Sequence, residues 1–181
     1  MVAVCLSVAA VNRVSSVVPI FLGRMAGSQN TDRFDLKQGV EMLWRELGGQ
    51  PAAGALRKEL AGRIPRVRQG VVESALPGAA VAVAAIDSIN VLLDDSLDDQ
   101  TYLVRSLGSA LSVSIELDKL EIDPPDEYPS WVVYELRGQS GLFEVLAVAS
   151  PNVDLDVVSE LRMRSGEEAM NYRYAMKSLL R

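Results

Sequence analysis

The stretch PGAAVAVAAIDSINVLL, from Pro77 to Leu93, decides the fold class of this chain. Proline suits the first turn of a helix, where its missing N–H costs no hydrogen bond. The residues after it are apolar on nearly every side of a helix rather than along one stripe. Such a helix is normally central and buried. The sequence therefore predicts a core helix over residues 77–93.

The first segment of the chain repeats apolar residues at steps of three and four, which is the period of a helix. This stripe is made of Val4, Val8, Val11, Ser15 and Val18. Asn12 and Arg13 fall off the stripe and are expected to point elsewhere. Pro19 restricts the residue before it and is predicted to end or kink this helix.

Further apolar stripes predict helices over residues 35–47, 51–62, 96–122, 130–149, 154–164 and 167–180. Asp35 and Gln38 have the spacing of a capping box at the start of the first of these. Ile64-Pro65 and Gly166 are predicted breaks. Because no segment alternates convincingly with period two, we predict no strand. Seven or eight helices indicate an all-α, single compact multi-helix domain over residues 1–181, orthogonal or bundle-like in packing.

Composition excludes several classes of function. The chain has 181 residues and no histidine, so it lacks the commonest general base and metal ligand. We identify no catalytic residue and no cofactor motif, which favours a protein that is not an enzyme. The formal net charge of −6 argues against a nucleic-acid partner, because such proteins need a basic face. The single cysteine, Cys5, cannot form an internal disulfide and is expected to be buried.

The apolar start of the chain, residues 1–11, invites comparison with a signal peptide or a membrane anchor. It lacks the basic residues that open a signal peptide. It is also shorter than the roughly 20 apolar residues that span a bilayer. We interpret it as a helix of the fold and expect a cytoplasmic protein with no membrane partner. A native chain that carries a few more residues before Met1 is compatible with this interpretation.

An acidic turn follows the predicted core helix and reads DDSLDD. Its carboxylates belong to Asp94, Asp95, Asp98 and Asp99, and Asp87 lies seven residues before the first of them. Oxygen-rich clusters suit Mg²⁺ or Ca²⁺, and all-helical isoprenoid synthases hold Mg²⁺ through a DDxxD motif, so a metal site is one interpretation. Acids at a helix junction also serve as caps and dipole partners. We expect the second role, a solvated turn that holds no metal.

The basic residues also gather in one segment, at Arg57, Lys58, Arg63, Arg66 and Arg68. A cluster of this kind can bind a phosphate or an acidic partner. We expect instead a solvated loop, paired with the acidic stretch from Asp94 to Glu127.

Two groups of large side chains stand out. Trp44 and Trp131 are expected to anchor the core. The C-terminal segment carries adaptable and amphipathic side chains of the kinds found at interfaces, namely Met170, Tyr172, Tyr174 and Met176. These four are the candidate interface residues for a protein partner or a second copy of the chain, and docking on the chain's own core is the alternative.

Several local motifs resemble the YjaG-like family of uncharacterised bacterial proteins. Arg13 with Pro19-Ile20-Phe21 is similar to the family's ER-x-x-PNY-x-x-F passage, although Asn12 stands in place of the acidic residue. Leu43-Trp44 with Leu47 is similar to its LxxLWxxL segment. The remaining matches are Ile64-Pro65, Ala85-Ile86-Asp87, Pro124-Pro125, Glu135, Gln139, Leu161-Arg162 and Gly166-Glu167. The resemblance implies an all-helical cytoplasmic protein with no assigned activity and an association with signalling through genome neighbourhood.

These observations favour a small cytoplasmic helical protein that acts by binding another protein or a second copy of itself. Two alternatives stay open. One is a metal- or ligand-dependent enzyme that uses the acidic turn from Asp94 to Asp99. The other is a small-molecule-binding regulator with an apolar pocket between helices.

Overall fold

The computed structural model describes residues 1–25, 30–125, 127–149 and 153–181, with only the backbone of residues 30–35 and 37. Within these ranges the chain forms eight α-helices and no strand. They are α1 (Val2–Ser15), α2 (Val17–Leu22), α3 (Asn30–Leu47), α4 (Gly54–Val72), α5 (Ala79–Leu93), α6 (Asp99–Lys119), α7 (Trp131–Ala149) and α8 (Leu155–Leu179). The predicted all-α, bundle-like class is confirmed.

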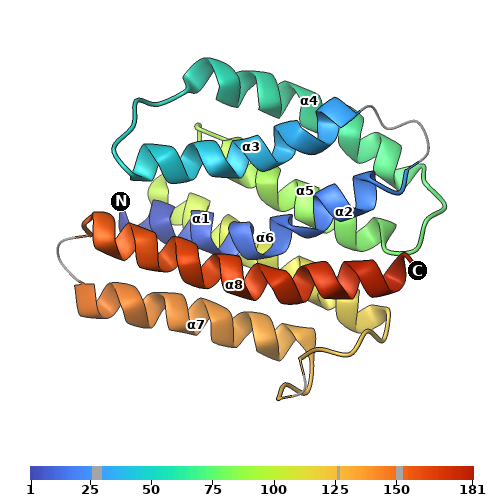
Figure 1. Cartoon of the computed structure of the whole chain (residues 1–181). Coiled ribbons are helices and arrows are strands. Elements are labelled where there is room, and N and C mark those ends of the chain that lie inside the picture. The colour runs from blue at the N-terminus through green and yellow to red at the C-terminus, as the bar shows by residue number, and fades with distance from the viewer. Residues whose placement is uncertain (26–29, 126, 150–152) are drawn as a thin grey trace.

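The helix α1 lies at the centre of the bundle. It packs against α3, α5, α6, α7 and α8, and Figure 1 shows it between α3 and α4 on one side and α7 and α8 on the other. Cys5, Val8 and Val11 are completely buried, as is Trp131 of α7 to within 2%. Because α1 is surrounded by other helices, it buries side chains on all sides, which explains why the segment is apolar.

The apolar start is longer than the sequence indicated, since the segment Val2–Leu22 is by length and composition sufficient to cross a membrane. It is the one such segment among the described residues. In the structure, 67% of its most apolar window is buried inside the protein. The core helix of a soluble protein has these properties too, so the fold is compatible with a soluble protein.

The break between α1 and α2 falls at Ser16, three residues before the predicted Pro19. Proline cannot donate a hydrogen bond to the carbonyl four residues earlier, so the disturbance appears on its N-terminal side. Pro19 itself lies in the first turn of α2, where a missing N–H is tolerated.

Three predicted helix boundaries are wrong. Pro65 and Gly166 lie inside the continuous helices α4 and α8, since both residues are exposed while one buried stripe runs past each of them. Leu60, Ile64, Val67 and Val71 make the stripe of α4. The helix α3 begins at Asn30, so Asp35 lies inside it and not at its start.

The helix α5 is buried on one side only. Val81, Ile86 and Ile89 are in the core, whereas Ala80 and Asn90 are exposed. Gly78 precedes the helix with a left-handed backbone (φ 80°), and a Cβ there would lie 3.2 Å from Met176 Sδ. The residue therefore has to be small for α8 to pack against the start of α5.

Candidate functional site

The helices α6 and α7 form an antiparallel pair whose register is fixed at two levels. The carboxylate of Asp118, near the end of α6, accepts hydrogen bonds from the backbone N–H groups of Trp131 (2.8 Å) and Val132 (3.2 Å) at the start of α7. Further along, the side-chain amide of Gln139 donates to the carbonyl of Leu107 (3.0 Å). Asp118 thus caps α7 and ties it to α6.

This register brings exposed apolar side chains to the same levels. Counted from the Gln139–Leu107 contact, Phe143 lies one turn further along α7 and Val104 one turn back along α6. In the other direction, Leu136 lies at the level of Leu111. The set, which we call the hairpin face, consists of Val104, Leu111 and Ile115 on α6 with Leu136 and Phe143 on α7.

Four of the five side chains of the hairpin face are exposed. Val104 is 63% exposed, Leu136 50%, Phe143 44% and Ile115 39%, and Leu111 is half-buried between them. Single exposed apolar residues are common on soluble proteins. Apolar side chains that adjoin one another on two neighbouring helices mark an interaction surface.

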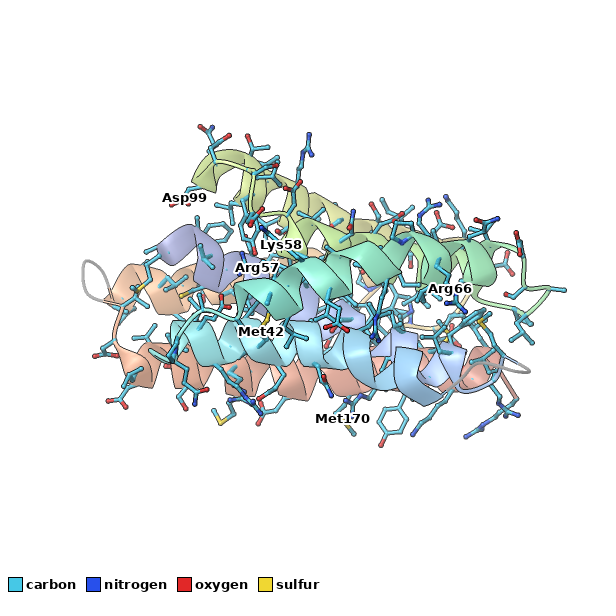
Figure 2. All side chains as sticks on the ribbon, turned by 90° about the horizontal axis from the view of Figure 1, so that it is seen from above. Met42, Arg57, Lys58, Arg66, Asp99 and Met170 are labelled. Carbon is cyan, nitrogen blue, oxygen red and sulfur yellow. The ribbon has the colours of Figure 1, made fainter. Side chains whose placement is uncertain are left out.

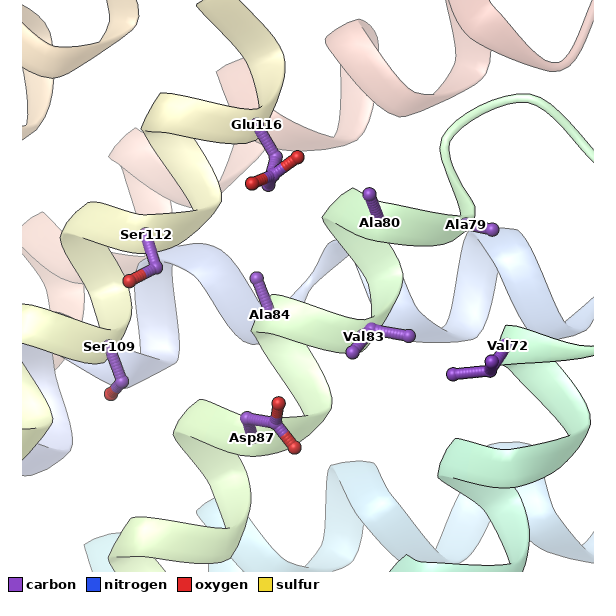
Figure 3. A pocket seen from close by; sticks show the side chains of 9 residues that line it. All are labelled: Val72, Ala79, Ala80, Val83, Ala84, Asp87, Ser109, Ser112 and Glu116. Carbon is purple, nitrogen blue, oxygen red and sulfur yellow. The ribbon is translucent and has the colours of Figure 1, made fainter. Parts of the chain in front are cut away.

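A groove of about 490 Å³ lies over the uncovered side of α5, between α4 and α6. Its lining residues are Val72, Ala79, Ala80, Val83, Ala84, Asp87, Ser109, Ser112 and Glu116. In Figure 3 the carboxylates of Asp87 and Glu116 stand at opposite ends of the groove, with alanines between them.

The polar groups of this groove already have partners. Asp87 pairs with Arg68 (2.7 Å) and Glu116 with Lys119 (2.6 Å). The hydroxyls of Ser109 and Ser112 donate to carbonyls of their own helix. The groove is therefore an apolar floor with partnered charges at its ends.

The most buried polar cluster surrounds Arg13, which the sequence pattern placed away from the core. That expectation is wrong, since the side chain of Arg13 is 1% exposed. Its guanidinium donates to the carboxylate of Glu135, which is 0% exposed, and to that of Glu168 (2.8 Å), which is 33% exposed. Helical periodicity did not predict this burial, because the burial depends on two carboxylates from other helices. They neutralise a cation that could not be buried alone.

The cluster extends through Glu135, which accepts hydrogen bonds from the Tyr172 hydroxyl (2.7 Å) and the Gln139 amide (2.8 Å). The Tyr172 hydroxyl is also bonded to Ser114 (2.8 Å). These side chains come from α1, α6, α7 and α8. Because the cluster joins side chains of four helices, it holds these helices in register.

The electrostatics agree with this role. Burial by itself lowers the pKa of Arg13, but the adjacent carboxylates of Glu135 and Glu168 outweigh it, and the pKa is raised. Burial, together with the nearby charge of Glu135, raises the pKa of Tyr172 well above its ordinary value. Both groups therefore keep their protons throughout the physiological range.

The acidic turn uses its carboxylates for local hydrogen bonds. Asp98 caps α6 by accepting from the N–H groups of Gln100 and Thr101, and Asp94 accepts from the N–H and hydroxyl of Ser96. Asp95 and Asp99 are exposed. Across the described ranges, no group of three or more His, Cys, Asp or Glu side chains is arranged to hold a metal ion.

The four candidate interface residues of α8 divide into two kinds. Tyr172 and Met176 are completely buried, so they belong to the protein's own core. Met170 is 42% exposed and Tyr174 61% exposed. Tyr174 lines a second groove, of about 430 Å³, together with Trp131 and the Pro124-Pro125 turn.

The predicted basic loop is a helix. Arg57, Lys58, Arg63, Arg66 and Arg68 all lie on α4, where Figure 2 shows Arg57 and Lys58 near one end and Arg66 further along. Arg57 pairs with Glu46, Arg63 with Glu59 and Arg68 with Asp87. None of these partners belongs to the acidic stretch that the sequence suggested. Asp126 of that stretch lies outside the described residues.

The two tryptophans and the cysteine that we expected in the core are buried there. Trp44 and Trp131 are each 2% exposed, and Cys5 is completely buried. Burial raises the pKa of the Cys5 thiol, so it is held in its unreactive form.

Comparison with known proteins returned no match to a family model, to a curated protein or to a solved structure. The resemblance to the YjaG-like family accordingly stays a prediction from local motifs. Sequence reasoning missed the hairpin face altogether, although apolar residues on the outer side of residues 104–115 and 136–143 were its visible signal. The cluster around Arg13 had a signal in the sequence as well. Glu135 follows Trp131 by four residues and precedes Leu142 by seven, so it lies on the same buried stripe of α7 as these two residues.

Proposed function

We propose that this chain is a cytoplasmic bacterial protein that acts by binding a protein, either another protein or a second copy of itself, through the hairpin face and performs no chemistry of its own. The observation that carries the proposal is the exposure of Val104, Ile115, Leu136 and Phe143 on two adjacent helices. Burying such residues against a partner contributes about 25 cal/mol per Å² of apolar surface. A role in signalling is part of the proposal through the family resemblance alone.

The hairpin face has a rigid support, which favours recognition by shape. The pair α6–α7 is tied together by Asp118 and Gln139, and α7 is tied to α1 by the buried Arg13–Glu135 pair. A surface that keeps its shape loses little entropy when it binds.

The test is co-purification of the tagged protein from cells of the organism that encodes it. The Leu136→Glu and Phe143→Glu variants place a charge in the hairpin face, and we expect each to lose the specific partner. Met163→Glu is the matched control, since Met163 is exposed to a similar extent (58%) on α8. Equal loss of the partner with all three variants would contradict the proposal, as would a robust enzymatic activity that these substitutions abolish. Circular dichroism confirms that each variant is folded.

A second candidate function is the binding of a small molecule in the groove over α5. Its apolar floor and two end carboxylates suit an organic dication with an apolar middle, whose charged ends would replace Arg68 and Lys119 as the partners of Asp87 and Glu116. A thermal-shift screen of alkyl diamines tests it, with Asp87→Asn as the variant that should lose the response. A response that is the same in the variant would count against this site.

A further inference from the structure

The outer side of α7 carries a pattern that is symmetrical about Ser140. The residues three, four and seven positions before and after Ser140 lie on the same face of the helix as Ser140. The positions are Val133, Leu136, Arg137, Ser140, Phe143, Glu144 and Ala147, which we call the α7 outer face. All of these are exposed except Val133, which is half-buried.

The apolar members of this face are related by that symmetry. Leu136 lies one turn before Ser140 and Phe143 lies nearly one turn after it, while Val133 and Ala147 lie two turns away on opposite sides. Two copies of α7 that cross antiparallel at Ser140 would thus place each Leu136 against the Phe143 of the second copy. A two-fold axis always produces such a self-complementary contact.

The charged members are related in the same way but with opposite sign. Arg137 lies three residues before Ser140 and Glu144 four residues after it. In the antiparallel arrangement each Arg137 meets the Glu144 of the second copy, whereas a parallel arrangement would set like charges against each other. Charged pairs at such flanking positions determine partner and direction when helices associate.

In the described part of the chain, Glu144 and Arg137 take part in no salt bridge, and Arg137 lies over the Tyr128 ring at 5.8 Å. The crossing point is occupied by small residues, Ser140 and Gly141, and a Cβ on Gly141 would meet no atom within 4 Å. Two helices can therefore approach closely there.

We infer that the α7 outer face binds the same face of a second copy of this chain, antiparallel and about a two-fold axis at Ser140. The inference rests on the proposed function, because it names a second copy as the protein partner of the α7 part of the hairpin face. Figure 1 shows α7 at the edge of the bundle, where a second copy has access.

The first test is a charge swap followed by sedimentation velocity over a range of protein concentrations. Arg137→Glu and Glu144→Arg each set like charges opposite each other at two symmetry-related places, so each should weaken the dimer about tenfold. The double variant restores both pairs and should regain wild-type affinity. Glu160→Arg with Arg164→Glu is the matched control, since this pair lies on α8 and both residues are solvent-accessible.

The second test places a cysteine on the axis. Ser140→Cys should form an intermolecular disulfide under mild oxidation, because the two copies of residue 140 face each other. Val148→Cys, at a side chain that is 90% exposed and off the axis, should cross-link far more slowly. The native Cys5 is buried and does not compete.

A wild-type protein that stays monomeric at every concentration overturns the inference, and so does a double swap that fails to restore the dimer. Equal cross-linking rates for the two cysteine variants also contradict it. These outcomes do not decide the proposed function, because the co-purification experiment asks a separate question. It asks whether Leu136→Glu loses a different protein. Failure of both experiments would remove the proposed function as well.

Discussion

The guanidinium of Arg13 and the carboxylate of Glu135 are 122 residues apart in the chain and form an ion pair that is shielded from water on all sides. Arg13 comes from the central helix α1 and Glu135 from the edge helix α7. The pair therefore connects the core to the helix that carries much of the exposed apolar surface.

Removal of one member of this pair should be strongly destabilising. Arg13→Met leaves Glu135 buried without its cation, and Glu135→Leu leaves Arg13 with Glu168 alone, so each single variant should lose about 3–5 kcal/mol of unfolding free energy. The double variant should lose less than the sum, because neither buried charge remains. Urea unfolding of the four proteins measures this coupling. Additive losses would show that the two charges do not stabilise each other.

The approach of Arg13 to α7 depends on Gly138. A Cβ at this position would lie 2.1 Å from Arg13 Nη1 and 3.0 Å from Glu168 Oε2, so Gly138→Ala should displace the guanidinium and destabilise the protein. Gly166→Ala is the control, since a Cβ there meets no atom within 4 Å. It should raise stability by up to about 1 kcal/mol through helix propensity. Thermal unfolding distinguishes the two, and a stabilising Gly138→Ala would refute the proposed contact.

Alkaline pH should destabilise the fold through its tyrosines. Burial raises the pKa of Tyr102 and Tyr134 to about 12 and that of Tyr172 well above the usual value, while an unfolded tyrosine titrates near pH 10. Between these values the folded protein holds more protons than the unfolded chain, so stability is complete below about pH 10 and falls as the pH rises. Urea unfolding at a series of alkaline pH values measures the slope. Tyr172→Phe should make the slope shallower, and an unchanged slope would show that Tyr172 ionises freely.

The acidic turn should behave as a cap and not as a metal site. Asp98→Ala removes the acceptor for two N–H groups at the start of α6 and should lower the Tm, whereas Asp98→Ser should keep most of the stability. Asp99→Ala, which alters no capping side chain, is the control. Addition of Mg²⁺ or Mn²⁺ should leave the Tm of the wild type unchanged. A rise in Tm that Asp94→Asn abolishes would revive the metal-dependent enzyme.

The thiol of Cys5 should report on the integrity of the core. It is completely buried with a raised pKa, so a thiol reagent should not react with the folded protein and should react fully in denaturant. Arg13→Met, which loosens the same helix, should speed the native-state reaction. Rapid labelling of the wild type would contradict the position of α1 in the core.

Periodicity was sufficient for the fold class because most buried residues follow apolar stripes. Val8, Val11 and Val18 are buried where their spacing indicates. Helix breaks were harder to predict. Proline and glycine, as at Pro65 and Gly166, have low intrinsic helix propensity, but this is a local preference that tertiary packing can override. Burial of the stripes on either side outweighs that local cost, and a single sequence does not show which stripes meet.

The buried ion pair and the exposed face could not be predicted for a related reason. Arg13 becomes tolerable in the core only because Glu135 arrives from a helix that begins more than a hundred residues later. Leu136 and Phe143 look like core residues until the neighbours of α7 are known. Both errors concern contacts between distant segments, which periodicity within one helix does not encode.

The central position of α1 has a consequence for synthesis on the ribosome. This most enclosed helix emerges before α5, α6, α7 and α8, which cover it in the finished protein. Until those segments follow, its valines and alanines stay exposed in the nascent chain, which is a condition that invites aggregation and calls for chaperones. Production of this protein in cells should therefore depend on chaperone supply more than its modest size suggests.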